Sequence, residues 1–266
     1  MWWFQEGLCA LPAALVVWTS ASFIFPFIIA VLLKHVDPLV PYISDTGTVT
    51  PEKCLFGIML NLSSLLGVAT MYVRYKHVEA LNTEESNVIR WNKAGLGLGL
   101  ISCFGLLVVA NFQKTDMIHM HILGAVLTFG IGGLYILLQT IMSYKMQTPV
   151  HGKRIFWIRL LVVIWCFVSM LLMFVTSLIL HFIFKGSTMA KKLHWDPHEN
   201  GYTSHVISTV SEWSLAFSFV SFFLTYIRDF KNIKLRVLAI LNHDHLEGPL
   251  HNAANEERTP LLAGAL

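Results

Sequence analysis

The residues of this sequence that could do chemistry are a few acids and histidines in apolar surroundings. Asp45 lies in the turn-rich stretch PYISDTGTVTPEKCLF, and His121 begins an apolar run. His205 and Glu212 lie near the start of a later apolar run. Histidine and carboxylate groups are zinc ligands, and a zinc-bound water can attack an ester or an amide. One hypothesis is therefore a catalytic or metal-binding site acting on a lipid.

Two other interpretations of the same residues stay open. The sequence contains no compact ligand motif such as HExxH, which favours a hydrogen-bonded network that ties polar loops to apolar helices. In either case Glu212, an acid inside an apolar run, must be neutral, paired or hydrated, because a bare charge at that depth costs several kcal/mol. The twelve histidines also fit a pH-responsive element in an acidic compartment. Whether a metal binds is left open.

The elements that must position these residues are membrane spans. Hydrophobic residues make up 55% of the chain and charged residues 13%, against roughly 25% charged residues in soluble domains. A bilayer-spanning helix needs about 20 apolar residues. The sequence therefore predicts an all-α polytopic membrane protein with six transmembrane helices in one bundle. The predicted spans are Leu8–Leu33, Cys54–Val73, Ala94–Phe112, His119–Met142, Trp157–Phe184 and Val206–Ile227.

The distribution of lysine and arginine predicts the orientation. The N-terminus, the 74–93 and 143–156 loops and the tail hold twelve of these residues, and the opposite loops hold six. Cytosolic segments carry the excess of positive charge, so both termini are predicted to be cytosolic. The loops 34–53, 113–118 and 185–205 then face a lumen or the outside. This divides the chain into a transmembrane domain, 1–227, and a cytosolic tail, 228–266.

Helical spacing gathers the polar residues at the luminal side. Small and polar residues recur every three or four positions in the fourth span, which places them on one helical face turned into the bundle. These residues are His121, Gly124, Thr128, Gly132, Tyr135 and Gln139. In the sixth span a serine-rich stripe, Ser211, Ser214, Ser218, Ser221 and Thr225, opposes His205, Ser208 and Glu212. The serine-rich stripe suits packing against another helix. We expect His121, His205 and Glu212 to share a luminal cavity with Ser44, Asp45, Asn111, His194, Asp196 and His198.

The tail carries two further signals. Arg228, Lys231 and Lys234 line one side of a segment whose other side is apolar, which is typical of a helix lying on the cytosolic leaflet; a continuation of the sixth span is the alternative. Beyond Asn242 the tail is polar and predicted to be disordered. Near its end, Glu257 precedes Leu261 and Leu262 by four residues, a spacing that resembles a dileucine sorting signal for endosomes and lysosomes.

Three motifs together resemble the Frag1/DRAM/Sfk1 family over essentially the whole chain. They are PYISDTG followed by Pro51, Glu52 and Phe56; the sequence HILGA from His121; and SEW from Ser211 leading to TYIRDF, which ends at Phe230. The resemblance implies six spans with cytosolic ends. For the DRAM branch it implies a lysosomal protein that promotes autophagy and can contribute to apoptosis. Other branches act in lipid biology. The family gives no catalytic residues to carry over.

We therefore expect a lysosomal multi-pass membrane protein that acts as a non-enzymatic regulator, with endosomal and plasma membranes as further locations. The alternative is a lipid-modifying or lipid-handling protein with a luminal site around Glu212 and His121. Expected partners are membrane lipids and adaptor proteins on the tail, and no cofactor is expected. Nucleic acid is excluded as a partner because the basic residues lie in short loops and one tail. The oligomeric state is left open.

Overall fold

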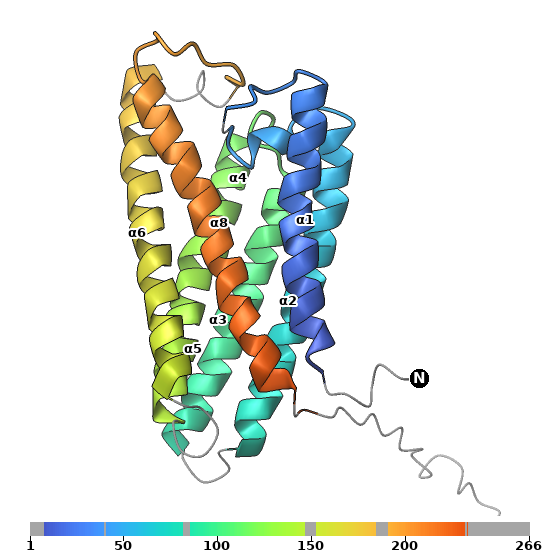
Figure 1. Cartoon of the computed structure of the whole chain (residues 1–266), viewed down its shortest axis with the longest axis vertical. Coiled ribbons are helices and arrows are strands. Elements are labelled where there is room, and N and C mark those ends of the chain that lie inside the picture. Colours follow the sequence, from blue (N-terminus) through green and yellow to red (C-terminus); the bar gives the residue numbers. More distant parts are fainter. Residues whose placement is uncertain are drawn as a thin grey trace, which may run out of the picture. The chain divides into compact units, whose positions relative to one another are not determined.

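The computed structural model describes residues 8–39, 41–81, 86–146, 153–184, 191–231 and 233. In this part of the chain the secondary structure is helical, and six helical segments are long and apolar enough to cross a membrane (Figure 1). The predicted all-α architecture is confirmed. The tail beyond Ile233, with Lys234 and the predicted sorting signal Glu257, Leu261 and Leu262, lies outside the described residues.

The six spans are built from eight helices, and a short 3₁₀ turn lies between the first two spans. The elements are α1 (Ala10–Leu32), η2 (Asp45–Gly47), α2 (Glu52–Leu81), α3 (Ser86–Asn111), α4 (Ile118–Ala125), η3 (Val126–Ile131), α5 (Gly132–Lys145), α6 (Lys153–Phe184) and α8 (Tyr202–Phe230). The consecutive elements α4, η3 and α5 form the fourth span.

Several helices, including α2, α3, α6 and α8, run further than the sequence predicts; α3, for example, begins at Ser86 and not at Ala94. Because α2 continues to Leu81, Arg74 and Lys76 belong to a helix and not to a 74–93 loop. Arg74 is fully buried, so it is no longer a loop charge in the orientation count. The last helix, α8, ends at Phe230, three residues beyond the expected domain boundary at 227. Of the basic residues assigned to a membrane-surface segment, Arg228 lies exposed in the last turn of α8 and Lys231 lies exposed just after it.

The fourth span turns its small and polar residues inward, as predicted. His121, Gly132, Tyr135 and Gln139 are all buried. The span is not one regular α-helix, because its middle, Val126–Ile131, is a π-helix. Such a wide turn inserts one extra residue and is often found at functional sites.

Helix α8 packs against both α6 and α1, and in Figure 1 it runs across the front of the bundle. Its serine-rich stripe contacts α6, where the Ser214 hydroxyl lies 2.7 Å from Trp165 Nε1 and 2.9 Å from Ser169 Oγ. Hydrogen bonds between small polar side chains are a usual means of holding transmembrane helices together. This confirms the packing role predicted for Ser214.

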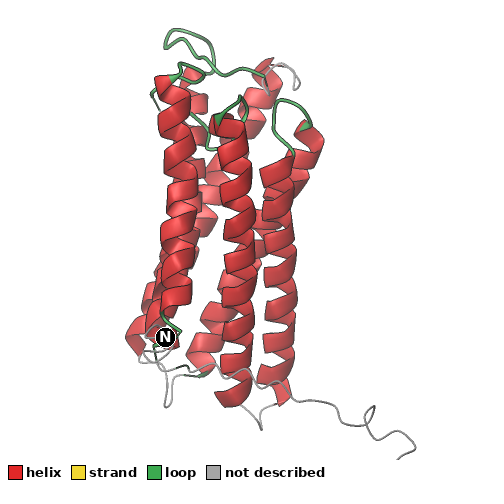
Figure 2. Cartoon of the chain, turned by 90° about the vertical axis from the view of Figure 1, so that its right-hand side faces the viewer, coloured by secondary structure: helices red, strands yellow, loops and turns green. Residues whose placement is uncertain are grey.

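Three loops gather at one end of the bundle, where they appear in green in Figure 2. They comprise residues 33–39, 41–51, 112–117 and 191–201, and we call this end the loop end. At the other end α1 begins and α8 ends, and the backbone N–H of Leu8 donates to the carbonyl of Phe230 at 3.1 Å. We call this the terminal end.

Candidate functional site

The polar stretch between the first two spans folds inward over the loop end. Residues 41–48, which we call the cap segment, are all buried. The hydroxyls of Thr46 and Thr48 donate to the carbonyls of Ile43 and Asp45, at 2.7 and 2.8 Å. Such local side-chain bonds are why threonine and aspartate favour turns. At Gly47 an added Cβ would lie 2.5 Å from the Phe56 ring, so the turn needs glycine there.

Asp45 holds the cap segment together. Its carboxylate forms a buried ion pair with Lys114 of the loop between α3 and α4. The Lys114 ammonium also lies 4.5 Å from the centre of the Tyr42 ring, in a cation–π arrangement. Burial raises the pKa of the Asp45 carboxyl, and the neighbouring Lys114 ammonium opposes that rise. Asp45 is therefore engaged in fixing two loops to each other.

Glu212 joins the cap segment to α8. One of its carboxyl oxygens accepts the backbone N–H of Ile43 at 2.8 Å. The next residue, Trp213, donates its indole N–H to the carbonyl of Pro41 at 2.8 Å. Two consecutive residues of the last helix thus satisfy backbone groups of the cap segment. Buried backbone groups need such partners, because leaving one unsatisfied costs about as much as a lost hydrogen bond.

The two histidines have different surroundings. The His205 ring stacks on Trp195 with ring centres 4.0 Å apart and meets Tyr42 edge-on at 5.3 Å. Its Nδ1 is buried without a hydrogen-bond partner among the described residues. His121 places Nδ1 2.8 Å from the carbonyl oxygen of Phe112, so this nitrogen donates. His205 is thus a packing residue of the loop end, whereas His121 fixes the α3–α4 loop.

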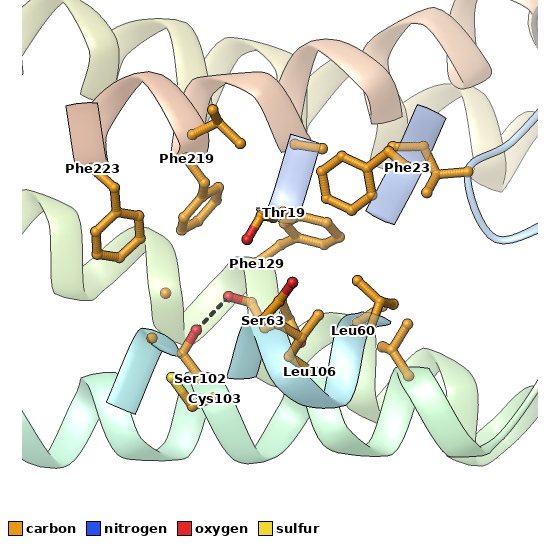
Figure 3. A pocket seen from close by; sticks show the side chains of 18 of the residues that line it. Thr19, Phe23, Leu60, Ser63, Ser102, Cys103, Leu106, Phe129, Phe219 and Phe223 are labelled. Carbon is orange, nitrogen blue, oxygen red and sulfur yellow. Dashed lines mark hydrogen bonds between the residues drawn. The ribbon is translucent and has the colours of Figure 1, made fainter. Parts of the chain in front are cut away.

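A cavity of about 120 Å³ lies under the cap segment, inside the bundle (Figure 3). Ile43, Ser44, His121 and Glu212 line it together with mainly apolar side chains. The walls come from α1, α2, α3, the fourth span and α8, and they include Leu15, Phe23, Phe56, Leu60, Leu106, Phe129, Phe219 and Phe223. Figure 3 shows aromatic rings and the hydroxyls of Thr19, Ser63 and Ser102 around this space.

The four candidate residues therefore divide into two pairs. His121 and Glu212 line the cavity, while Asp45 and His205 are engaged in contacts of the cap and the last loop. In the described part of the chain, no three His, Cys, Asp or Glu side chains are placed to hold a metal ion. The arrangement supplies an apolar chamber with polar groups at one end, where Asp45 lies close enough to Glu212 for their charges to interact.

The other polar residues expected in the luminal cluster form separate pairs. His194 and the backbone N–H of Trp195 both contact the Asp37 carboxylate, at 2.9 and 2.7 Å. Asn111 donates its side-chain amide to Asn61 at 2.9 Å. The carboxylate of Asp196 accepts the backbone N–H of His198 at 2.9 Å. These contacts match the hydrogen-bonded network that the sequence left open as an alternative.

Sequence reasoning missed a second polar cluster, near the terminal end. Asp229 of α8 accepts from Arg159 of α6 at 2.6 Å and from Arg74 of α2 at 3.2 Å. Both guanidinium groups are fully buried, and both lie over the Tyr226 ring. The lone Arg159 inside an apolar run was the available signal, because an ionised residue in a span needs a partner or a function.

Neighbouring helices accept most of the remaining hydrogen bonds of the cluster, while Nη2 of Arg74 is buried with no hydrogen-bond partner among the described residues. Arg159 donates to Ser143 Oγ at 2.5 Å and to Thr225 Oγ1 at 2.9 Å. Arg74 donates to Gln139 Oε1 at 3.3 Å. The cluster therefore joins α2, α5, α6 and α8.

Comparison with known proteins agrees with this fold. The sequence model of the family described as "Frag1/DRAM/Sfk1/Cwh43P N-terminal domain" matches residues 7–233. The chain is 59% identical over 263 residues to DNA damage-regulated autophagy modulator protein 2 of Homo sapiens, covering 99% of both chains. It is 41% identical over 243 residues to DNA damage-regulated autophagy modulator protein 1 of Homo sapiens, covering 91% of this chain and 98% of the relative.

A more distant relative is the modulator of macroautophagy TMEM150B-A of Xenopus laevis, 33% identical over 144 residues, which cover 53% of this chain and 60% of the relative. No solved structure matches the chain. Because the family match spans most of the sequence and the identity extends over nearly all of both chains, this protein belongs to the Frag1/DRAM/Sfk1 family.

Proposed function

We propose that this protein is an autophagy modulator of the lysosomal membrane that contributes to apoptosis and acts as a regulator without catalysis. The observation that carries the proposal is the 59% identity, over 99% of both chains, to a relative named as an autophagy modulator. The six membrane-spanning helices agree with a membrane location. The engagement of Asp45 and His205 in loop packing supports a role that does not depend on a four-residue catalytic site.

The test is rescue of knock-out cells at matched expression. Wild-type protein should restore autophagic flux, measured by turnover of a lipidated autophagosome marker with and without lysosomal inhibition. It should also restore the apoptotic response to DNA damage. An empty vector and an unrelated lysosomal six-span protein are the controls. Failure of the wild-type chain to change flux in either direction would refute the proposal.

Lysosomal residence is assigned here to the tail residues Glu257, Leu261 and Leu262. Changing both Leu261 and Leu262 to Ala should move the protein toward the cell surface, as measured by surface biotinylation. The matched control changes Leu246 and Leu250, two other leucines of the tail, to Ala. Equal surface levels for the two double variants would contradict the sorting role.

The proposed orientation places the terminal end in the cytosol and the loop end in the lumen. When the buried Arg74 is left out, the segments predicted to be cytosolic still hold eleven lysines and arginines, whereas the opposite segments hold six. An epitope at the C-terminus should be labelled after selective permeabilisation of the plasma membrane. An epitope inserted after Pro197 should be labelled only after lysosomal membranes are opened; the reverse pattern would invert the assignment.

A second candidate function is lipid handling, and the specific observation that favours it is the apolar cavity ended by Glu212, His121 and Ser44. A protein that only scaffolds other proteins does not need such a chamber. In the rescue assay, Ala216→Leu, which fills the cavity from its α8 wall, should then fail to restore flux and should leave a changed lysosomal lipid profile. The matched control is Ala14→Leu, on the exposed face of α1. Full rescue by both variants would remove this candidate.

A further inference from the structure

The polar cluster near the terminal end is short of one negative charge. Arg74, Arg159 and Asp229, which we call the arginine cluster, bring two guanidinium groups and one carboxylate together. Both arginine side chains are 0% exposed, and the Asp229 side chain is 3% exposed. In the described part of the chain, no other carboxylate pairs with either arginine. A buried charge needs a partner, because removing an ion from water is costly unless an opposite charge offsets that cost.

The neighbouring groups do not supply the missing charge. Nη1 of Arg74 lies 3.4 Å from Nδ1 of His77. Because arginine can only donate, this nitrogen accepts, and the His77 ring is neutral. The other acceptors of the cluster are neutral oxygens, from Ser143, Thr225 and Gln139. The Tyr226 ring lies 5.4 Å from the Arg74 guanidinium and 5.0 Å from that of Arg159. Such cation–π contacts are attractive, but the ring carries no net charge.

Arg74 also keeps donors for a ligand. Its Nε donates to Gln139 at 3.3 Å, and its Nη1 donates to Asp229 at 3.2 Å. Nη2 is buried and bonds to none of the described residues. A guanidinium has five N–H donors, and the two on Nη2 therefore need an acceptor. Hydrogen bonds from arginine to an anion are stronger than those to a neutral acceptor, so an anion satisfies both the donors and the charge.

The surroundings of the cluster favour an anion as well. Many lysines and arginines are exposed at the terminal end, namely Lys76, Arg90, Lys93, Lys145, Lys153, Arg154, Arg228 and Lys231. The acids described at this end are Glu79, which is paired with Lys76, and Asp229. A surface of one sign attracts ions of the opposite sign and raises their local concentration.

We propose that the arginine cluster binds one small monovalent anion of the halide class, which accepts the N–H groups of Arg74 Nη2. One negative charge makes the cluster neutral, whereas a divalent phosphate would leave it negative. A monatomic ion needs little more room than a water molecule, which suits a site whose arginines are fully buried. The bound ion would hold α2 against the α6–α8 pair. This inference goes beyond the proposed function and does not depend on it.

The experiment measures equilibrium binding of radioactive chloride to the purified full-length protein in an uncharged detergent. Gluconate keeps the ionic strength constant. The wild type should bind one chloride per chain in a saturable manner, and unlabelled bromide should displace it. Inorganic phosphate at the same concentration should not. As a second readout, chloride at about 100 times its dissociation constant should raise the unfolding temperature by at least about 3 °C, because a ligand of the folded state stabilises it.

Two variants locate the site. Arg74→Gln removes the extra charge and leaves Arg159 and Asp229 as a balanced pair. Its side-chain amide can still donate to Gln139, so we expect it to fold. It should weaken chloride binding at least about tenfold, because the charged donor is gone. The matched control is Arg154→Gln, which removes an exposed charge from α6 outside the cluster. This variant should bind chloride as the wild type does.

The outcomes decide the proposal. Saturable binding that Arg74→Gln loses and Arg154→Gln keeps establishes the site. The proposal fails if the wild type shows no saturable binding, if phosphate displaces chloride as well as bromide does, or if Arg74→Gln binds like the wild type. Equal losses in both variants assign the binding to the general surface charge and also overturn it. If Arg74→Gln does not fold, the stoichiometry and the displacement series of the wild type decide alone.

Chloride binding and the rescue of knock-out cells are separate readouts. A chain that binds chloride and does not restore autophagic flux leaves the site standing and refutes the proposed function. A chain that restores flux and binds no chloride does the reverse.

Discussion

At the scale of single residues, Glu212 has two separable tasks. Its carboxyl oxygen accepts the Ile43 N–H, and its remaining surface faces the cavity. Glu212→Ala should lower the free energy of unfolding by about 1–3 kcal/mol, because a buried backbone donor loses its partner. Glu212→Gln keeps an acceptor in the same place, so its thermal unfolding in detergent should stay close to that of the wild type.

If Glu212→Gln unfolds at the temperature of Glu212→Ala, the charge and not the hydrogen bond holds the cap segment. The comparison also makes Glu212→Gln the better variant for functional assays, because a loss of rescue then cannot be attributed to loss of the fold.

Thr19 provides a second test at this scale. Its hydroxyl has no partner among the residues described, so Thr19→Val removes no hydrogen bond and should leave the unfolding temperature unchanged or slightly raised. The control is Thr70→Val, because the Thr70 hydroxyl donates to the carbonyl of Leu66 at 2.7 Å. That change should cost about 1 kcal/mol. Equal destabilisation by both changes would indicate that Thr19 does bind a partner.

At the scale of elements, the cap segment depends on close packing over the start of α2. Gly47→Ala would place a methyl group 2.5 Å from the Phe56 ring, and the ring is itself only 2% exposed. Overpacking of this kind typically costs about 1–3 kcal/mol. We expect a lower unfolding temperature, together with faster proteolysis within residues 41–48. Gly97→Ala is the control, since nothing lies within 4 Å of an added Cβ there.

The arginine cluster is an element-scale feature because it ties α2 and α6 to one carboxylate of α8. Asp229→Asn leaves Arg74 and Arg159 buried without their common counter-charge, and breaking a buried pair in this way costs about 3–5 kcal/mol. We expect low expression and loss of cooperative unfolding. Arg228→Gln, one position earlier and exposed, should have little effect. Normal stability of Asp229→Asn would mean that the arginines are satisfied in another way.

The sequence predicted those features of the elements that depend on residue spacing within a single helix. The inward face of the fourth span follows from the spacing of His121, Tyr135 and Gln139, and it is confirmed. The end of the second span was placed before Arg74 because a charge was expected to leave the membrane. That placement was wrong, since α2 continues to Leu81 and the Arg74 guanidinium contacts Asp229 and Gln139 inside the bundle. The π-helix at 126–131 has no signal in residue spacing.

At the scale of the whole molecule, the candidate site was predicted in part. Turn-forming residues indicated a connector at 41–56, but the burial of the cap segment within it depends on Glu212, which is 169 positions from Ile43. Such long-range contacts are not encoded in local spacing. For the same reason, sequence reasoning gave no indication that Lys114 pairs with Asp45 or that Trp195 stacks on His205. Orientation in the membrane and the sorting signal remain predictions.

The contacts of α8 have a consequence for the order in which the protein is made. Among the spans, α8 is synthesised last, yet residues at both ends of the bundle need it as a partner. Ile43 at the loop end bonds to Glu212, and Arg74, 155 positions before Asp229 in the sequence, bonds to Asp229. A chain truncated before Tyr202 holds two guanidinium groups with no carboxylate from the missing helix. We expect pulse-chase labelling to show that this truncation is degraded early, while the full chain matures only after its last span is inserted. Cellular quality control can thus distinguish an incomplete chain from a complete one by whether α8 pairs with the buried arginines.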